Sequence, residues 1–123
     1  MKKIDICIFK PENLLLDCIK EMTERAKIES SQSLGVVLDG KKLIGSLSDG
    51  DIRRYLVSPS ADITSDTIKD VMHKFPFSII ENDLDNVKEK IIELNRKINC
   101  IFITDLDNNY LYTIEINDLH KES

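Results

Sequence analysis

The residues of this chain that are best suited to binding chemistry lie together in one stretch, IGSLSDGDIRRYL. Gly45 has no side chain and permits close approach of another group, and the hydroxyl of Ser48 can bond either a ligand or the start of a helix. Asp51 offers two acceptor oxygens that suit a pair of neighbouring hydroxyl groups, while Arg53 and Arg54 add positive charge. The stretch therefore has the groups needed to bind a small polar anion.

The same residue types also serve purely structural roles. A Ser or Asp at the start of a helix is a common cap, and Asp49 or Asp51 could cap the helix that the following apolar residues predict. That helix would direct its free amide groups and its positive end towards the same corner, which favours a phosphate. Two adjacent arginines are usually solvated or paired with nearby acids, here Asp49 or Asp70. Both interpretations stay open at this point.

Composition and charge narrow the possible partners. The chain has 123 residues, 41% hydrophobic and 32% charged, as expected for one folded module. Its formal net charge is -5, and its basic residues are scattered between acids, so nucleic acid is not an expected partner. No run of eighteen apolar residues and no signal-peptide pattern is present, which predicts a cytoplasmic protein without a membrane partner.

The cysteines and histidines do not form a reactive or metal-binding set. Cys7, Cys18 and Cys100 are widely spaced among apolar residues and are predicted to be reduced and buried. His73 and His120 have no acid or nucleophile at a useful spacing, so no catalytic residues and no metal site are predicted. The chain is therefore not expected to be an enzyme.

The hydrophobic pattern predicts the same series of elements twice. In the first half it predicts a strand (4–9), a helix after Pro11, two strands (34–38 and 43–47) around an Asp-Gly turn, and a helix after Asp51. In the second half it predicts a short connecting helix (66–73), a strand (77–80), a helix after NDLDN, and two strands (100–103 and 110–116) around the turn DLDNN. Both longer helices have an apolar stripe, formed by Leu15, Cys18, Ile19, Met22 and Ala26 in one and by Leu84, Val87, Ile91 and Leu94 in the other.

The two halves also align with each other in sequence. LGVVLDGKKLIGSLSDGDI matches CIFITDLDNNYLYTIEINDL, with one extra residue in the second turn. Neither half is large enough to cover its own sheet, so a repeat of about sixty-five to seventy residues predicts two half-domains that bury each other's surfaces. We expect residues 1–62 to form one unit and residues 63–123 the other, together making one module of the α+β class.

This organisation resembles a pair of CBS domains, the arrangement called a Bateman module. The residues that carry the resemblance are Gly45, Ser48 and Asp51, the strand LGVVLD ahead of them, and DVMHKFPFSII, which is similar to the family's link between units. The resemblance implies an α+β fold of two β-α-β-β-α units packed with pseudo-twofold symmetry. The longer motif SDGDIRR is similar to CBS pairs attached to sugar-phosphate isomerases, and more so to those preceding sugar-nucleotide transferase domains. These 123 residues contain neither catalytic domain.

The resemblance implies a ligand site at this motif. It places Ser48 and Asp51 at the ribose-and-phosphate corner of an adenine nucleotide of the AMP, ADP or ATP class, with Asp51 holding the ribose diol. Arg53 and Arg54 are the candidates for phosphate contact. The adenine slot stays open between two sets of residues, which are Val36 with Val37 and residues 77–79.

The second repeat departs from the motif. Tyr112 stands where the first repeat has Gly45, and Glu115 stands where it has Ser48. A tyrosine blocks close approach and a glutamate adds negative charge, so this second site is predicted to be degraded. Asp118 keeps the acid and is retained as a candidate ligand residue, although it could instead cap a terminal helix.

The expected function is a non-catalytic regulatory module that binds an adenine nucleotide and controls a sugar-nucleotide enzyme, as an attached domain or a separate chain. Modules of this family associate as flat homodimers through their helices, so both apolar helix stripes could be partly interface. The alternative is therefore a structural dimerisation module with an empty cleft.

Overall fold

The computed structural model describes the chain apart from residues 1, 29–32, 88, 90, 92–99 and 116–123. Its contacts divide the chain into two units. The first, here called the Asp51 unit, is Ile6–Pro76. The second, the Tyr112 unit, combines Phe77–Ser123 with Met1–Asp5.

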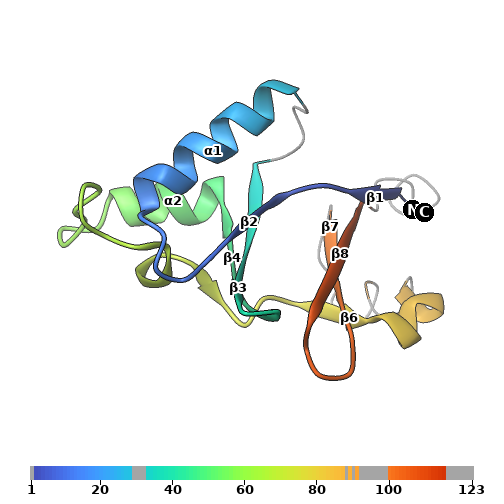
Figure 1. Cartoon of the computed structure of the whole chain (residues 1–123). Helices are drawn as coiled ribbons and strands as arrows, with labels where there is room; N and C mark the ends of the chain where they lie inside the picture. The colour runs from blue at the N-terminus through green and yellow to red at the C-terminus, as the bar shows by residue number, and fades with distance from the viewer. Residues whose placement is uncertain (1, 29–32, 88, 90, 92–99, 116–123) are drawn as a thin grey trace. The chain divides into compact units, whose positions relative to one another are not determined.

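The Asp51 unit is a four-stranded sheet in the order β2-β3-β4-β5. The strands are β2 (Cys7–Phe9), β3 (Leu34–Asp39), β4 (Lys42–Ser48) and β5 (His73–Lys74), and the helices are α1 (Leu15–Ile28), α2 (Asp49–Leu56) and the 3-10 helix η1 (Ile68–Asp70). β2 and β3 are parallel, and the other two pairs are antiparallel. Figure 1 shows α1 and α2 on the same side of this sheet.

The β3-β4 hairpin confirms the turn predicted from Asp39-Gly40. Gly40 has a φ of 63°, a left-handed conformation that glycine adopts without steric cost. The hairpin matters for the site because β4 runs directly into α2, with Ser48 as the last residue of the strand and Asp49 as the first of the helix.

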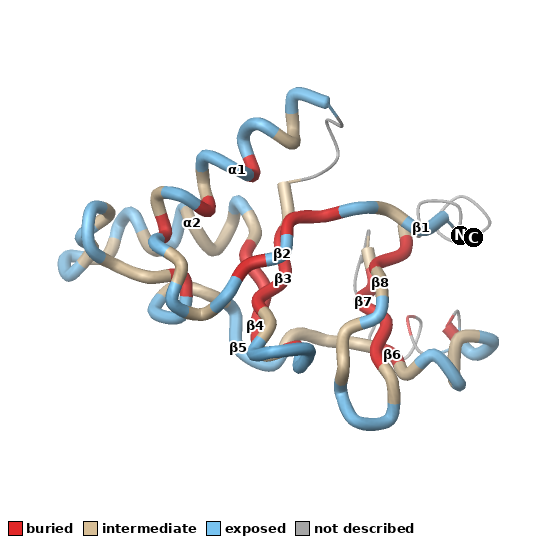
Figure 2. The backbone as a smooth tube through the Cα atoms, viewed as in Figure 1, coloured by how far each residue is buried: buried red, intermediate tan, exposed pale blue. Residues whose placement is uncertain are grey.

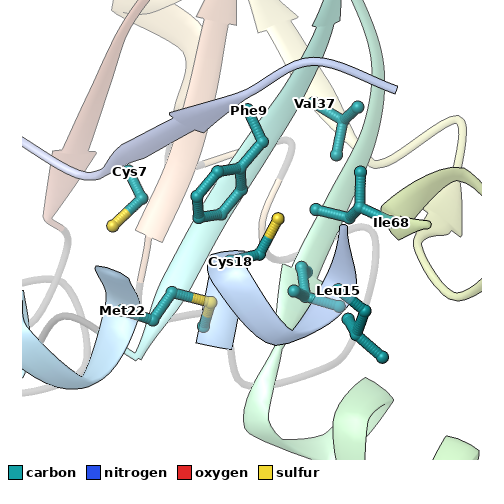
Figure 3. Packing of buried hydrophobic residues seen from close by; sticks show 8 residues of the cluster. Cys7, Phe9, Leu15, Cys18, Met22, Val37 and Ile68 are labelled. Carbon is teal, nitrogen blue, oxygen red and sulfur yellow. The ribbon is translucent and has the colours of Figure 1, made fainter. Parts of the chain in front are cut away.

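The apolar stripe of α1 lies in the core of its own unit. Leu15, Cys18 and Met22 are buried and pack with strand residues and with Ile68 of η1. Figure 3 shows the labelled members of this cluster: Cys7, Phe9, Leu15, Cys18, Met22, Val37 and Ile68. Ile19 of the same stripe is only partly buried against this cluster, so a role of the stripe as part of an interface stays a prediction.

The Tyr112 unit is a second four-stranded sheet, in the order β1-β8-β7-β6. Its strands are β1 (Lys2–Ile4), β6 (Ser78–Ile80), β7 (Cys100–Thr104) and β8 (Tyr110–Glu115), and a 3-10 helix, η2 (Glu81–Asn86), follows β6. Val87 and Ile91 are buried in its core with strand residues, and Leu84 packs against them. Most of the helix predicted after NDLDN lies outside the described residues.

Both hairpins have a shift in strand register at equivalent positions, which supports the internal repeat. The register shifts between Val37 and Leu38 in one hairpin and between Ile103 and Thr104 in the other. In the first hairpin Val37 pairs with Gly45, and in the second Ile103 pairs with Tyr112. Figure 2 shows the buried residues concentrated in the paired strands of each sheet, with exposed hairpin turns. Tyr112 therefore occupies the position of Gly45, as the sequence alignment predicted.

The strand predicted over residues 4–9 is in fact two strands in different sheets. β1 pairs with β8 in the Tyr112 unit, whereas β2 pairs with β3 in the Asp51 unit. β5 likewise precedes β6 in sequence but pairs with β4. Alternating apolar residues continue through both strands, so the pattern alone gives no sign of a change of sheet. Because of this exchange the chain passes from the Tyr112 unit into the Asp51 unit at Ile6 and back into the Tyr112 unit at Phe77. The boundary after residue 62, which refers to the sequence repeat, stays a prediction.

Among the described helices, none is long and apolar enough to cross a membrane.

Candidate functional site

The corner between β4 and α2 is organised by a capping box. Ser48 is the N-cap, with φ −126° and ψ 170°, and its hydroxyl accepts a hydrogen bond from the amide of Asp51 at 3.3 Å. In return, Oδ2 of Asp51 accepts hydrogen bonds from the amide and hydroxyl of Ser48, both at 3.0 Å. The N-cap is thus Ser48 and Asp51 is its partner in the capping box, so of the acids considered as caps Asp51 takes part and Asp49 does not. Ser48 has the short side chain and extended backbone that this position requires.

The second carboxylate oxygen of Asp51 is also engaged. Its Oδ1 accepts a hydrogen bond from Nη2 of Arg54 at 2.7 Å. The Asp51 side chain is only 12% exposed, whereas that of Arg54 is 74% exposed. A ligand diol that binds Asp51 must therefore compete with the exposed Arg54 guanidinium for Oδ1 and with the two hydrogen bonds from Ser48 for Oδ2. Arg53 is exposed on the same helix.

Gly45 permits a close approach, but a side chain of the same unit occupies the space. A Cβ added at Gly45 would clash with Sδ of Met72, lie 2.9 Å from its Cγ, and lie 3.2 Å from the carbonyl oxygen of His73. Gly45 also pairs with Lys74 of β5. In this structure the missing side chain thus lets Met72 and β5 pack against β4.

A hollow of about 520 Å³ opens beside Asp51. Its charged lining residues are Asp51, Arg54, Asp66 and Asp70. Tyr55, Ser58, Ser60 and Val71 complete the lining. The hollow therefore joins α2 to the loop that follows it and to η1, all within the Asp51 unit.

The carboxylates of Asp66 and Asp70 are held in place by neutral donors. The hydroxyl of Tyr55 donates to Oδ2 of Asp66 at 2.5 Å, and the amide of Asp62 donates to the same atom at 2.9 Å. Oδ2 of Asp70 accepts from the amide of Thr67 at 3.3 Å and from its hydroxyl at 3.1 Å. Desolvation and the bond to Asp66 raise the pKa of Tyr55, so its hydroxyl stays protonated as a donor.

Several of these lining residues are not predicted from the sequence. Tyr55 follows Asp51 by four positions and Arg54 follows it by three, so helical spacing alone could have placed all three on one face of α2. Asp66 had no such signal, because it reaches the hydroxyl of Tyr55 and the lining of the hollow only through the fold of the loop SPSADITS. From the sequence, Asp70 is predicted only as a possible ion-pair partner for an arginine.

The residues considered for the adenine slot are mostly covered. Val36 and Val37 are fully buried, Ile79 is 2% exposed, and Phe77 packs against the core of the Tyr112 unit. None of the four lines the hollow beside Asp51. Asp118 lies outside the described residues. The slot therefore stays a prediction.

The equivalent position of the second repeat is filled by side chains of its own unit. Nζ of Lys3 lies 4.1 Å from the centroid of the Tyr112 ring. Burial, together with a hydrogen bond to Glu81, raises the pKa of Tyr112. These contacts support the prediction that the second site is degraded.

The three cysteines are free thiols, as predicted. Cys7 and Cys18 are buried, whereas Cys100 is only half-buried, which corrects the expectation for that residue. Desolvation by burial raises the pKa of Cys18 to about 12 and also raises the pKa of the other two, so all three are poor nucleophiles. No group of three metal-ligating side chains occurs in the part of the chain that the structure describes.

The comparison with known families decides what kind of module this is. Residues 1–58 match the model of the CBS domain family. The chain carries a CBS domain. The matched residues contain the whole Gly45, Ser48 and Asp51 motif, and the resemblance identified in the sequence is confirmed.

A curated relative of this CBS chain is a probable arabinose 5-phosphate isomerase of Haemophilus influenzae. The two are 25% identical over 107 residues, which cover 87% of this chain and 30% of the relative. The CBS chain thus spans about 30% of the length of that relative.

Solved structures similar to the CBS chain share its fold at low identity. OpuCA of Staphylococcus aureus has a TM-score of 0.73 at 15% identity, covering 98% of this chain and 93% of that one. CBSX2 of Arabidopsis thaliana, solved in complex with AMP, has a TM-score of 0.72 at 16% identity and coverages of 99% and 90%. The cytosolic domain of the Mg²⁺ channel MgtE, solved in complex with ATP, has a TM-score of 0.71 at 12% identity and coverages of 96% and 45%.

Proposed function

We propose that this chain is a non-catalytic regulatory module that binds an adenine nucleotide of the AMP, ADP or ATP class beside Asp51. The observation that carries the proposal is the position of Asp51. Its largely buried carboxylate lies in the first turn of α2, directly after β4, where the motif predicts the ribose corner, and it lines a hollow of about 520 Å³. A cavity of this size is within the range of small-molecule sites.

The relatives support this choice of ligand and of role. One similar solved structure is a complex with AMP and another is a complex with ATP. The isomerase relative is about three times as long as the aligned segment, which supports a catalytic domain as the regulated partner, joined in cis or acting in trans. A sugar-phosphate or sugar-nucleotide enzyme, a cytoplasmic location and a homodimeric assembly belong to the same proposal.

Regulation follows if the ligand favours one arrangement of the unit over another. A ribose diol at Oδ1 of Asp51 would release Arg54, whose guanidinium could then meet a phosphate. Asp70 of η1 also lines the hollow. A bound ligand would therefore contact both α2 and the segment that leads into β5 and hold them in one arrangement. The population of the linked arrangement would then rise with ligand concentration.

A second candidate function is a ligand-free dimerisation module. The contact of Met72 with Gly45 favours it, because the surface that Gly45 leaves open is already covered. The capping role of Ser48 and Asp51 also explains both residues without a ligand.

The test compares thermal shifts of the wild type, Asp51→Ala and Asp49→Ala with adenosine, AMP, ADP, ATP and GTP. A ligand at a hundred times its Kd adds roughly 2.7 kcal/mol of stability, which raises the Tm by several degrees. We expect an adenine ligand to stabilise the wild type and Asp49→Ala but not Asp51→Ala. Asp49 is the matched control because it is an acid in the first turn of α2 that does not line the hollow.

The shift caused by ligand, rather than the Tm itself, is the readout, since losing Asp51 also weakens the cap of α2. A folded wild type that none of these ligands stabilises would support the dimerisation module instead.

A further inference from the structure

The charge of the hollow is unbalanced. Among the described residues that line it, Asp51, Asp66 and Asp70 are acids and Arg54 is the single base. Arg54 is already paired with Asp51 at 2.7 Å. Asp66 and Asp70 accept hydrogen bonds from hydroxyl and amide groups, which orient the carboxylates but do not neutralise them. The lining therefore keeps an excess of negative charge.

We infer that the hollow selects adenine ligands with few phosphates, preferring AMP to ATP, and that Asp66 and Asp70 determine this selectivity. The inference rests on the proposed function, since it concerns the ligand of the same site. Like charges in a partly desolvated hollow repel one another more strongly than in bulk water, and salt screens them only beyond about 8 Å. Each added phosphate therefore costs binding free energy unless a new cation meets it.

One phosphate can be accommodated where three cannot. Once a ribose diol takes Oδ1 of Asp51, the released Arg54 supplies one guanidinium for one phosphate. Among the described residues of the lining there is no further base for the β- and γ-phosphates of ATP. Ser58 and Ser60 supply neutral hydroxyls, which can form hydrogen bonds with sugar oxygens or water but add no positive charge.

Isothermal titration calorimetry on the whole chain tests this inference, with adenosine, AMP and ATP measured in EDTA at low salt. The variants are Asp66→Asn and Asp70→Asn, in which the amide oxygen keeps the acceptor role while the charge is removed. The control is Asp39→Asn, an exposed acid at the hairpin turn of the same unit, outside the lining of the hollow.

We expect the wild type to bind AMP roughly tenfold more tightly than ATP, and each hollow variant to bind ATP at least about threefold more tightly than the wild type does. Adenosine affinity should stay within about twofold in all variants, since adenosine carries no charge. Mg²⁺ should narrow the gap between AMP and ATP, because it neutralises part of the triphosphate.

ATP binding that equals or exceeds AMP binding in the wild type, with no gain in either hollow variant, would overturn the inference while leaving nucleotide binding intact. Absence of binding by every adenine compound would overturn the proposed function and this inference together. Two separate variants keep the test decisive if one of them is poorly folded.

Discussion

Two glycines at the site have different structural roles, and the same substitution distinguishes them. A methyl group at Gly45 would clash with Met72, on the side of β4 where β5 packs. A methyl group at Gly50, in the first turn of α2, would lie 3.4 Å from the exposed Arg54 guanidinium, which can move away.

We therefore expect Gly45→Ala to lower the free energy of unfolding by about 1–3 kcal/mol through overpacking. Gly50→Ala is the matched control and should raise the free energy of unfolding by about 0.5–1 kcal/mol, because alanine loses less entropy in a helix. Urea titration followed by circular dichroism measures both. If Gly45→Ala proved as stable as the wild type, Met72 would not be held against β4 as the structure has it.

Residue types were enough to predict a functional site at the junction of β4 and α2, but not the side chains that surround it. The sequence predicted Ser48 and Asp51 as a pair because their spacing fits both a cap and a ligand site, and the structure joins them by reciprocal hydrogen bonds. It did not predict that Met72 would cover Gly45, since that contact depends on pairing between strands that are far apart in sequence. The acidic lining was missed for the same reason.

At the scale of elements, α2 depends on its cap. It has only eight residues and none of them is fully buried, since Ile52 and Tyr55 pack only partly against the core. A helix this short is marginal without such support, so its cap matters. We expect Ser48→Ala to destabilise the chain by about 0.5–2 kcal/mol, because it removes the side chain that accepts from the Asp51 amide.

The control for the cap is Ser60→Ala, an exposed loop serine whose loss should change stability by less than about 0.5 kcal/mol. Thermal unfolding of both variants measures the difference. Equal Tm values for the two variants would show that the capping box contributes nothing to stability.

The elements that were predicted correctly are those whose sequence signals all lie within the element and its flanking turns. The hairpin around Gly40 was predicted because the turn chemistry and both apolar runs are local. The strand over residues 4–9 was mispredicted because membership of a sheet is a non-local property. The segment predicted as a helix over residues 66–73 contains the short η1 and the first residue of β5, because β4 offers an edge to which His73 can bond.

At the scale of the whole molecule, the first strand and the last described strand belong together. β1 pairs with β8 over three residues, and Lys3 lies over the ring of Tyr112. We expect removal of residues 1–5 to lower the Tm and to speed amide hydrogen exchange in β8, since β8 would become an exposed edge.

Lys3→Ala separates the two contributions, because it removes the cation above the ring but keeps the backbone pairing. It should cost only about 0.5–1 kcal/mol. Unchanged exchange in β8 after the truncation would contradict the pairing of β1 with β8.

The exchange of strands between the repeats also sets the order in which the two sheets can form during synthesis. Of the described strands β1 is the first to be synthesised, yet the strand that β1 pairs with, β8, is the last of them to appear. The sheet next to Asp51 can close once residue 74 is available, whereas the other sheet must wait until residue 115 has been synthesised. Contacts between such distant residues form slowly, so the unit that carries the candidate site is the one expected to mature first.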